Sequence, residues 1–164
     1  MPPPVPPDIV EVERALARIT HLLNRAKQHD SIAAEAGVPV DRAAVPILRQ
    51  LSDSEPLRPG DLAALLAVEA PHVTRQIQRL EATGYVERIP DPDDRRAHRI
   101  RLTPAGRQAV DRILDAARQL IWHALAEWSP QDREQLASLF HRMVDDFIAH
   151  AATRGITLRG TSGA

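Results

Sequence analysis

Residues 71–104 read PHVTRQIQRLEATGYVERIPDPDDRRAHRIRLTP, and the fold is decided within this stretch. Val73, Ile77 and Leu80 recur at helical spacing, so they predict a helix with one buried stripe and a polar opposite face. Gly84 then supplies the residue type that most easily adopts the left-handed conformation at a helix end. The first part of the stretch is therefore expected to be an amphipathic helix that stops at this glycine.

The second part of the stretch predicts a β-hairpin. Residues 85–89 and 98–102 are strand-like, and a proline-rich, charged turn separates them. Arg95 and Arg96 are expected at or near the tip of the hairpin. Acids that faced a polyanion would repel it, so at least one acid of the turn is expected to pair with a hairpin arginine. The acids of the turn are Asp91, Asp93 and Asp94.

Two prolines mark the starts of two short helices. Pro59 and Pro71 fit the first helical position, where the missing N–H costs little, and they open helices expected at 59–67 and 71–83. Two short helices joined by a tight turn are the outline of a helix-turn-helix. With the hairpin, they predict a winged helix-turn-helix at residues 41–103.

Longer helices flank this unit, as cap residues and apolar periodicity indicate. They are expected at 9–28, at 41–51, at 104–128 and from 130 onward. Pro46 should bend or loosen the second of them, because a proline within a helix removes a backbone donor. Asp8 and Asp41 are expected to cap the first two of these helices, and Thr103 and Ser129 the last two. The predicted fold class is mainly α with a small β-hairpin wing.

Composition limits the class of protein. With 164 residues the chain suits one domain, expected at 9–152, between a proline-rich disordered tail at 1–8 and a flexible tail at 153–164. The absence of cysteine excludes disulfides, thiolate metal sites and thiol redox sensing. We find no secretory signal or long apolar span, so a cytoplasmic protein without a membrane partner is expected.

No catalytic, cofactor or metal motif is present, so the chain is not expected to be an enzyme. The seven histidines are scattered, without metal-binding spacing, and a cluster of Asp93, Asp94 and His98 would lie on a poorly preorganised hairpin. Aromatic residues make up only 3% of the chain, which argues against binding single strands by base stacking.

Basic residues gather in the central stretch although the whole chain carries a net charge of −1. Between residues 70 and 101 seven arginines face five acids. The polar face of the helix at 71–83 has the hydrogen-bonding side chains that reading a major groove requires. Its candidate DNA-binding residues are His72, Thr74, Arg75, Gln78 and Arg79, joined on the hairpin by Arg95 and Arg96. An ordinary solvated helix face is the alternative, and codon bias is an alternative cause of the many arginines.

Three runs of sequence resemble the MarR family of regulators. They are LEATGYVER at 80–88, DPDDRR at 91–96 and LTPAGR at 102–107. The resemblance implies a homodimer held by helices within 9–40 and 104–152, with two reading helices in successive major grooves and a wing arginine in the minor groove. It also implies double-stranded DNA with a pseudo-palindromic operator as partner, and release when a small, often aromatic or phenolic, acid binds. The effector-binding residues stay unassigned.

The sequence departs from the family pattern at three positions. Arg58 and Ala70 stand where a serine or threonine often caps each short helix, and Ala67 stands at the usual turn glycine. Losing a cap costs about 1 kcal/mol. We expect Arg58 to contact phosphate instead. The branch of the family that senses oxidants through cysteine is excluded.

Two alternatives to an effector-released repressor stay open. One is a helical interaction module whose basic hairpin docks an acidic protein. The other is a regulator of the same fold that responds to zinc held by histidines. Activation in place of repression, the operator sequence and the regulated genes also stay open.

Overall fold

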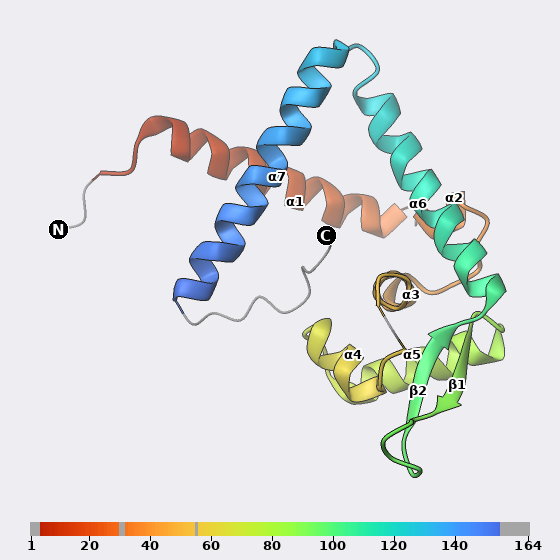
Figure 1. The fold of residues 1–164 in the computed structure, drawn as a ribbon. Helices are drawn as coiled ribbons and strands as arrows, with labels where there is room; N and C mark the ends of the chain where they lie inside the picture. The colour runs from red at the N-terminus through yellow and green to blue at the C-terminus, as the bar shows by residue number, and fades with distance from the viewer. Residues whose placement is uncertain (1–3, 30–31, 55, 155–164) are drawn as a thin grey trace.

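The computed structural model describes residues 4–29, 32–54 and 56–154, with helices before and after one small hairpin (Figure 1). The elements are, in order, α1 (Pro7–His29), α2 (Ile32–Glu35), the 3₁₀ helix η1 (Arg42–Ala44), α3 (Val45–Ser52), α4 (Pro59–Leu65), α5 (Ala70–Ala82), β1 (Val86–Pro90), β2 (His98–Leu102), α6 (Pro104–Ala124) and α7 (Pro130–Thr153). The expected fold class, mainly α with a hairpin wing, is confirmed.

The buried core belongs to the middle of the chain. We call the part from α2 to the first half of α6 the head. Its core draws a few apolar side chains from each element. The largest that are fully buried are Val38, Ile47, Leu48, Leu62, Val73, Ile77, Leu80, Ile100 and Val110. Burying apolar surface is worth roughly 25 cal/mol per Å², so this contiguous cluster supplies much of the head's stability.

The wing is a two-stranded antiparallel hairpin with Val86 opposite Leu102 and Pro90 opposite His98. Leu57, in the segment before α4, joins its open edge by backbone hydrogen bonds to Ile100 of 3.1 and 2.8 Å. The wing is therefore fastened to the chain just before the helix-turn-helix. The sequence did not predict this bridge, since a single residue shows no strand periodicity.

A close backbone approach fixes α6 to the head. A Cβ added at Gly106 would overlap the carbonyl oxygen of Tyr85. Thr103 closes the same joint, because its hydroxyl donates to the carbonyl of Gly84 over 2.6 Å and accepts from the Gly106 N–H over 3.0 Å. The predicted cap at Thr103 is confirmed, as is that at Ser129, which accepts from the N–H of Asp132.

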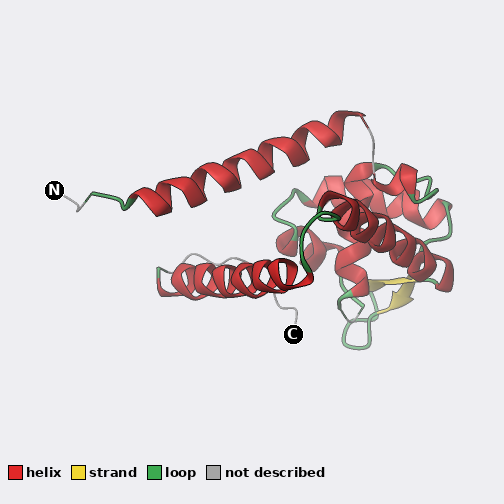
Figure 2. Ribbon diagram, turned by 90° about the horizontal axis from the view of Figure 1, so that it is seen from above, coloured by secondary structure: helices red, strands yellow, loops and turns green. Residues whose placement is uncertain are grey.

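Three helical segments, which we call the arms, extend away from the head: α1, the second half of α6, and α7. In Figure 1 α1 and α7 cross in projection, but Figure 2 shows them well apart. Each arm exposes large apolar side chains. They are Ile9, Val12, Ile19 and Leu22 on α1, Leu120, Ile121 and Trp122 on α6, and Leu139, Phe140, Val144 and Phe147 on α7.

The structure corrects several sequence-based expectations. Pro46 does not lie in the interior of a helix: Asp41 caps the short η1, and α3 starts afresh at Val45 with this proline in its first turn, where no backbone hydrogen bond is lost. Residues 32–35 form a helical turn that was not expected. The third correction is that α6 ends at Ala124, four residues early.

The predicted tails are only partly described. Helix α1 starts at Pro7, two residues earlier than expected, and Asp8 lies in its first turn instead of capping it. At the other end α7 reaches Thr153. Residues 1–3 and 155–164 of the predicted tails lie outside the described residues.

Candidate nucleic-acid interface

The outward face of α5 carries the predicted reading residues. Val73, Ile77 and Leu80 are at most 2% exposed, which confirms the predicted buried stripe. The opposite side chains, those of Thr74, Arg75, Gln78 and Arg79, are exposed, and His72 is half-buried at the start of the helix. Because α5 packs on the head through its apolar stripe, these polar side chains lie along its opposite, exposed side.

The starts of the two short helices lack side-chain caps. Arg58 is the N-cap residue of α4, and Glu69, not Ala70, is that of α5; neither side chain accepts a hydrogen bond from the helix. The turn between the helices places Ala67 at φ +52°, a left-handed conformation that usually selects glycine. The tight turn thus forms in spite of an unfavourable residue.

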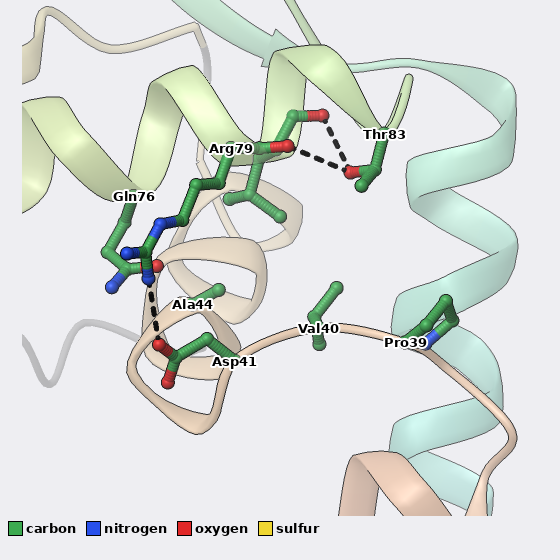
Figure 3. A pocket seen from close by; sticks show the side chains of 8 residues that line it. Pro39, Val40, Asp41, Ala44, Gln76, Arg79 and Thr83 are labelled. Atoms are coloured by element: carbon green, nitrogen blue, oxygen red, sulfur yellow. Dashed lines mark hydrogen bonds and ion pairs between the residues drawn. The ribbon is translucent and has the colours of Figure 1, made fainter.

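Arg79 is tied to the segment before α3. Its Nη1 donates to Oδ2 of Asp41 over 3.1 Å, across a small pocket of about 140 Å³ between α5 and η1 (Figure 3). The backbone N–H of Ala43 is the main cause that lowers the pKa of Asp41 below its ordinary value. The ion pair is largely exposed, so its contribution to stability is small.

Gln76 is a polar residue of α5 that the sequence analysis did not single out. It is only 4% exposed, and its Oε1 finds no hydrogen-bond partner among the described residues. An unpaired buried acceptor costs about 1–3 kcal/mol. Its position, three residues after Val73 on the apolar stripe, was the only signal that it would be buried.

The tip of the wing presents two arginines. The N–H of Ala97 donates to the carbonyl of Asp94 over 2.9 Å, which closes a turn with Arg95 and Arg96 at its two central positions. The Asp94 side chain accepts from the Arg96 N–H and rigidifies the turn. Both arginines are exposed, and among the described residues neither side chain has an acidic partner.

Ion pairs divide the arginines of the central stretch into two groups. Four have an acidic partner: Arg79 with Asp41, Arg88 with Glu81, Arg99 with Asp91 and Asp93, and Arg101 with Glu87. Arg75, Arg95 and Arg96 have none within the described ranges. The expected pairing between a turn acid and a wing arginine is confirmed: the arginine is Arg99 in β2, which pairs with Asp91 and Asp93.

Arg58 lies at the junction of helix and wing. Its Nε donates to Oδ2 of Asp91 over 2.7 Å, and this bond, more than any other influence, raises the pKa of the guanidinium. The side chain stays 42% exposed, so one side of the guanidinium faces solvent. This partly exposed guanidinium remains open to the expected phosphate contact.

In the described part of the chain no group of three or more histidine or acidic side chains is arranged to hold a metal ion. No helix of the described residues is long and apolar enough to cross a lipid bilayer.

Comparisons with known proteins agree with this geometry. The family model described as MarR family matches residues 41–98. The chain is 29% identical over 143 residues to the uncharacterized HTH-type transcriptional regulator YxaD of Bacillus subtilis, covering 87% of this chain and 96% of that protein. It is 32% identical over 93 residues to the multiple antibiotic resistance protein MarR of Escherichia coli, covering 56% and 63%.

A solved structure is similar over most of its length. The crystal structure of a probable transcriptional regulator from Pseudomonas aeruginosa aligns with a TM-score of 0.56 and 31% identity, covering 76% of this chain and 96% of that one. The polar face of α5 beside an arginine-tipped hairpin defines a winged helix-turn-helix protein of the DNA-binding, transcription-regulating class. Within that class the chain belongs to the MarR family.

Proposed function

We propose that the protein is a homodimeric cytoplasmic repressor that reads a pseudo-palindromic operator in double-stranded DNA. The observation that carries the proposal is a set of arginines without an acidic partner in the described part of the chain: Arg75 on α5, and Arg95 and Arg96 on the wing. An α-helix fits the major groove, and an arginine at a hairpin tip suits the narrow minor groove. Arg75 and Gln78 are assigned to base edges.

The proposed dimer is supported by the apolar side chains of the arms. Monomeric proteins rarely expose large contiguous apolar surface. Here three helices each expose several large apolar side chains, and α1 and α7 lie well apart in Figure 2. A twofold dimer through residues 9–40 and 104–152 buries these side chains. Its symmetry places two identical heads against one duplex, with half-sites about one helical turn apart.

The dimer is tested by measuring the molar mass with light scattering as the protein elutes from a size-exclusion column. We expect a mass twice the 18.1 kDa of one chain for the wild type and a shift toward 18.1 kDa for Phe147→Glu, which puts a charge into the interface. Val68→Glu is the control, because Val68 is also exposed but lies in the head. A wild type that stays monomeric at all concentrations would refute the dimer.

DNA reading is tested by selecting duplexes from a random library and measuring affinity at several salt concentrations. Arg75→Ala should weaken binding to the selected duplex by about 5- to 100-fold, the range for loss of a good base contact. Arg118→Ala, which removes an exposed arginine from α6, serves as control and should leave the affinity within about twofold. Selection of no common sequence by the wild type would overturn the proposal.

We further propose that a small acid releases the DNA. Support comes from the packing of α6 on α2 and α3, which links the arms to the head. Salicylate should raise the thermal unfolding temperature and lower affinity for the selected duplex, whereas zinc should do neither. The reverse result would favour the metal-responsive alternative.

A further inference from the structure

A buried carboxylate lies where the wing meets the helix-turn-helix. The side chain of Asp91, the first residue after β1, is fully buried, although the hairpin turn around it is exposed. A carboxylate is costly to bury unless it is paired and hydrogen-bonded. The contacts that hold it there therefore indicate its role.

Four hydrogen bonds reach this carboxylate, two at each oxygen. Oδ1 accepts from the backbone N–H groups of Asp93 and Asp94, over 2.9 and 3.2 Å. Oδ2 accepts from Nε of Arg58 over 2.7 Å and from Nε of Arg99 over 2.9 Å. One side chain thus joins the wing turn, strand β2 and the first residue of the helix-turn-helix. We call Arg58, Asp91, Asp93 and Arg99 the Asp91 cluster.

The hydrogen-bonding geometry is specific for a carboxylate. Both guanidinium groups approach the same oxygen with N–H donors, so that oxygen must be an acceptor. Hydrogen bonds from Arg58 and then Arg99 hold the pKa of Asp91 far below its ordinary value, so the group is charged at any physiological pH. An asparagine in this place has only one side-chain oxygen, so its amide N–H₂ group would face N–H donors in either orientation. It would meet the two arginines if the oxygen faced the turn, and the backbone N–H groups of the turn if the oxygen faced the arginines.

Charge alone gives no reason for an acid here. A carboxylate beside a DNA-binding surface weakens attraction to phosphate, so removing it would strengthen binding to any duplex. The position of Asp91 between the wing and the helix-turn-helix does give a reason for an acid here. Arg95 and Arg96 are two and three residues beyond Asp93 on the wing tip, while Arg58 opens α4, which leads into the reading helix.

We infer that Asp91 is a positioning residue for sequence specificity: it holds the wing and the helix-turn-helix in the one relative orientation in which both can contact their grooves together. This inference rests on the proposed function. Without the cluster, α5 and the wing can still each meet phosphate, but they lose the fixed spacing that a particular sequence rewards. Specific binding should therefore fall while non-specific binding does not.

The experiment compares three variants on two duplexes. The probes are the duplex that the wild type selects from a random library and a shuffled duplex of the same length and composition. Asp91→Asn removes the buried charge. Asp93→Asn is the matched control, since it removes one charge from the same cluster but from a side chain that is 76% exposed. Asp91→Glu keeps the charge and displaces it by one methylene.

For Asp91→Asn we expect affinity for the selected duplex to fall about tenfold or more, within the range of a lost specific contact, while affinity for the shuffled duplex stays or rises. Asp93→Asn should raise both affinities slightly. Asp91→Glu, with no change of net charge, should lose specific affinity alone, and it keeps the test valid if Asp91→Asn does not fold.

Two results would overturn the inference. If Asp91→Asn behaves like Asp93→Asn, the carboxylate acts only through its charge. If both affinities of Asp91→Asn and Asp91→Glu fall together, in step with a lower thermal unfolding temperature, the residue is only structural. Failure of the proposed function is distinguishable, because the wild type would then select no duplex at all.

Discussion

Arg79 on the reading helix and Asp41 before α3 share a hydrogen bond of 3.1 Å, so an arginine expected to contact DNA is already engaged by an acid of its own chain. The acid also caps η1 through the N–H of Ala43. In the proposed complex, phosphate must compete with this acid for the arginine. The contact therefore limits how strongly Arg79 can attract phosphate.

Replacing Asp41 should strengthen DNA binding. We expect Asp41→Asn to raise affinity for any duplex by about 2- to 10-fold, because an exposed ion pair is worth only up to about 1 kcal/mol and one repulsive charge is also removed. Stability should change little, since asparagine caps helices as well as aspartate does. Fluorescence anisotropy on a labelled duplex measures this. Asp61→Asn, an exposed acid of α4 without a contact to Arg79, is the control, and an equal gain there would refute the role of the pair.

The wing tip should carry a salt-dependent part of DNA affinity. Arg95→Ala and Arg96→Ala should each weaken binding and reduce the slope of log affinity against log salt by about 1. Arg101→Ala should have a smaller effect, because Glu87 already offsets that charge. A drug that fills the minor groove should reduce the DNA affinity of the wild type more than that of whichever variant, Arg95→Ala or Arg96→Ala, lacks the arginine inserted in that groove. Identical competition for all four proteins would exclude the wing from the minor groove.

The turn between α4 and α5 offers a stabilising substitution. Ala67 has φ +52°, a conformation that costs an L-residue roughly 1–2 kcal/mol. Glycine avoids this cost, but its greater conformational freedom in the unfolded chain offsets part of the gain in stability. Ala67→Gly should therefore raise the free energy of unfolding by up to about 1 kcal/mol in urea titrations. Ala64→Gly, inside α4, should lower it by about 0.5–1 kcal/mol. Destabilisation by Ala67→Gly would contradict the left-handed turn.

The joint between head and α6 should tolerate no side chain. Gly106→Ala should lower the free energy of unfolding by about 2–3 kcal/mol, because the new methyl group overlaps the Tyr85 carbonyl oxygen and backbone must move. Gly60→Ala is the matched control: its added Cβ meets nothing, and helix propensity favours it by up to about 1 kcal/mol. Equal stability of the two variants would show that the joint is loose.

Acid should destabilise the protein partly through Asp91. Its pKa is lower in the folded than in the unfolded chain, so its stabilisation is complete above the unfolded value of about 3.9 and is lost as pH falls below it. Urea titrations from about pH 6 down to about pH 3 should show this loss in the wild type and a shallower loss in Asp91→Asn. The same slope in both proteins would show that the carboxylate is not stabilised by folding.

Much of the head was predictable because its signals are local. The stripe of α5, the hairpin, whose first strand lies one residue later than the expected 85–89, and the caps at Thr103 and Ser129 each follow from residues within a few positions of one another. All the residues proposed on the face of α5 share that face, and the two on the wing share its tip. Local periodicity and turn chemistry were sufficient for these elements.

What the sequence could not predict depends on contacts between distant residues. The bridge from Leu57 to Ile100 and the bond from Arg58 to Asp91 span 43 and 33 positions, and no periodicity reports them. Pro46 was misplaced because the preceding turn is 3₁₀ and not α, a difference that the cap at Asp41 does not reveal. The partners that divide the arginines into two groups likewise emerge only in three dimensions.

The joint at Gly106 turns α6 into a lever. The first half of α6 is packed on the head, and the whole helix spans 21 residues, about 30 Å at 1.5 Å per residue. Over that length a tilt of about 10° moves the far end by about 5 Å, more than the rise of one base pair. Small angular adjustments among the arms would therefore be magnified into mismatched head spacing on the duplex, while each head kept its own internal structure.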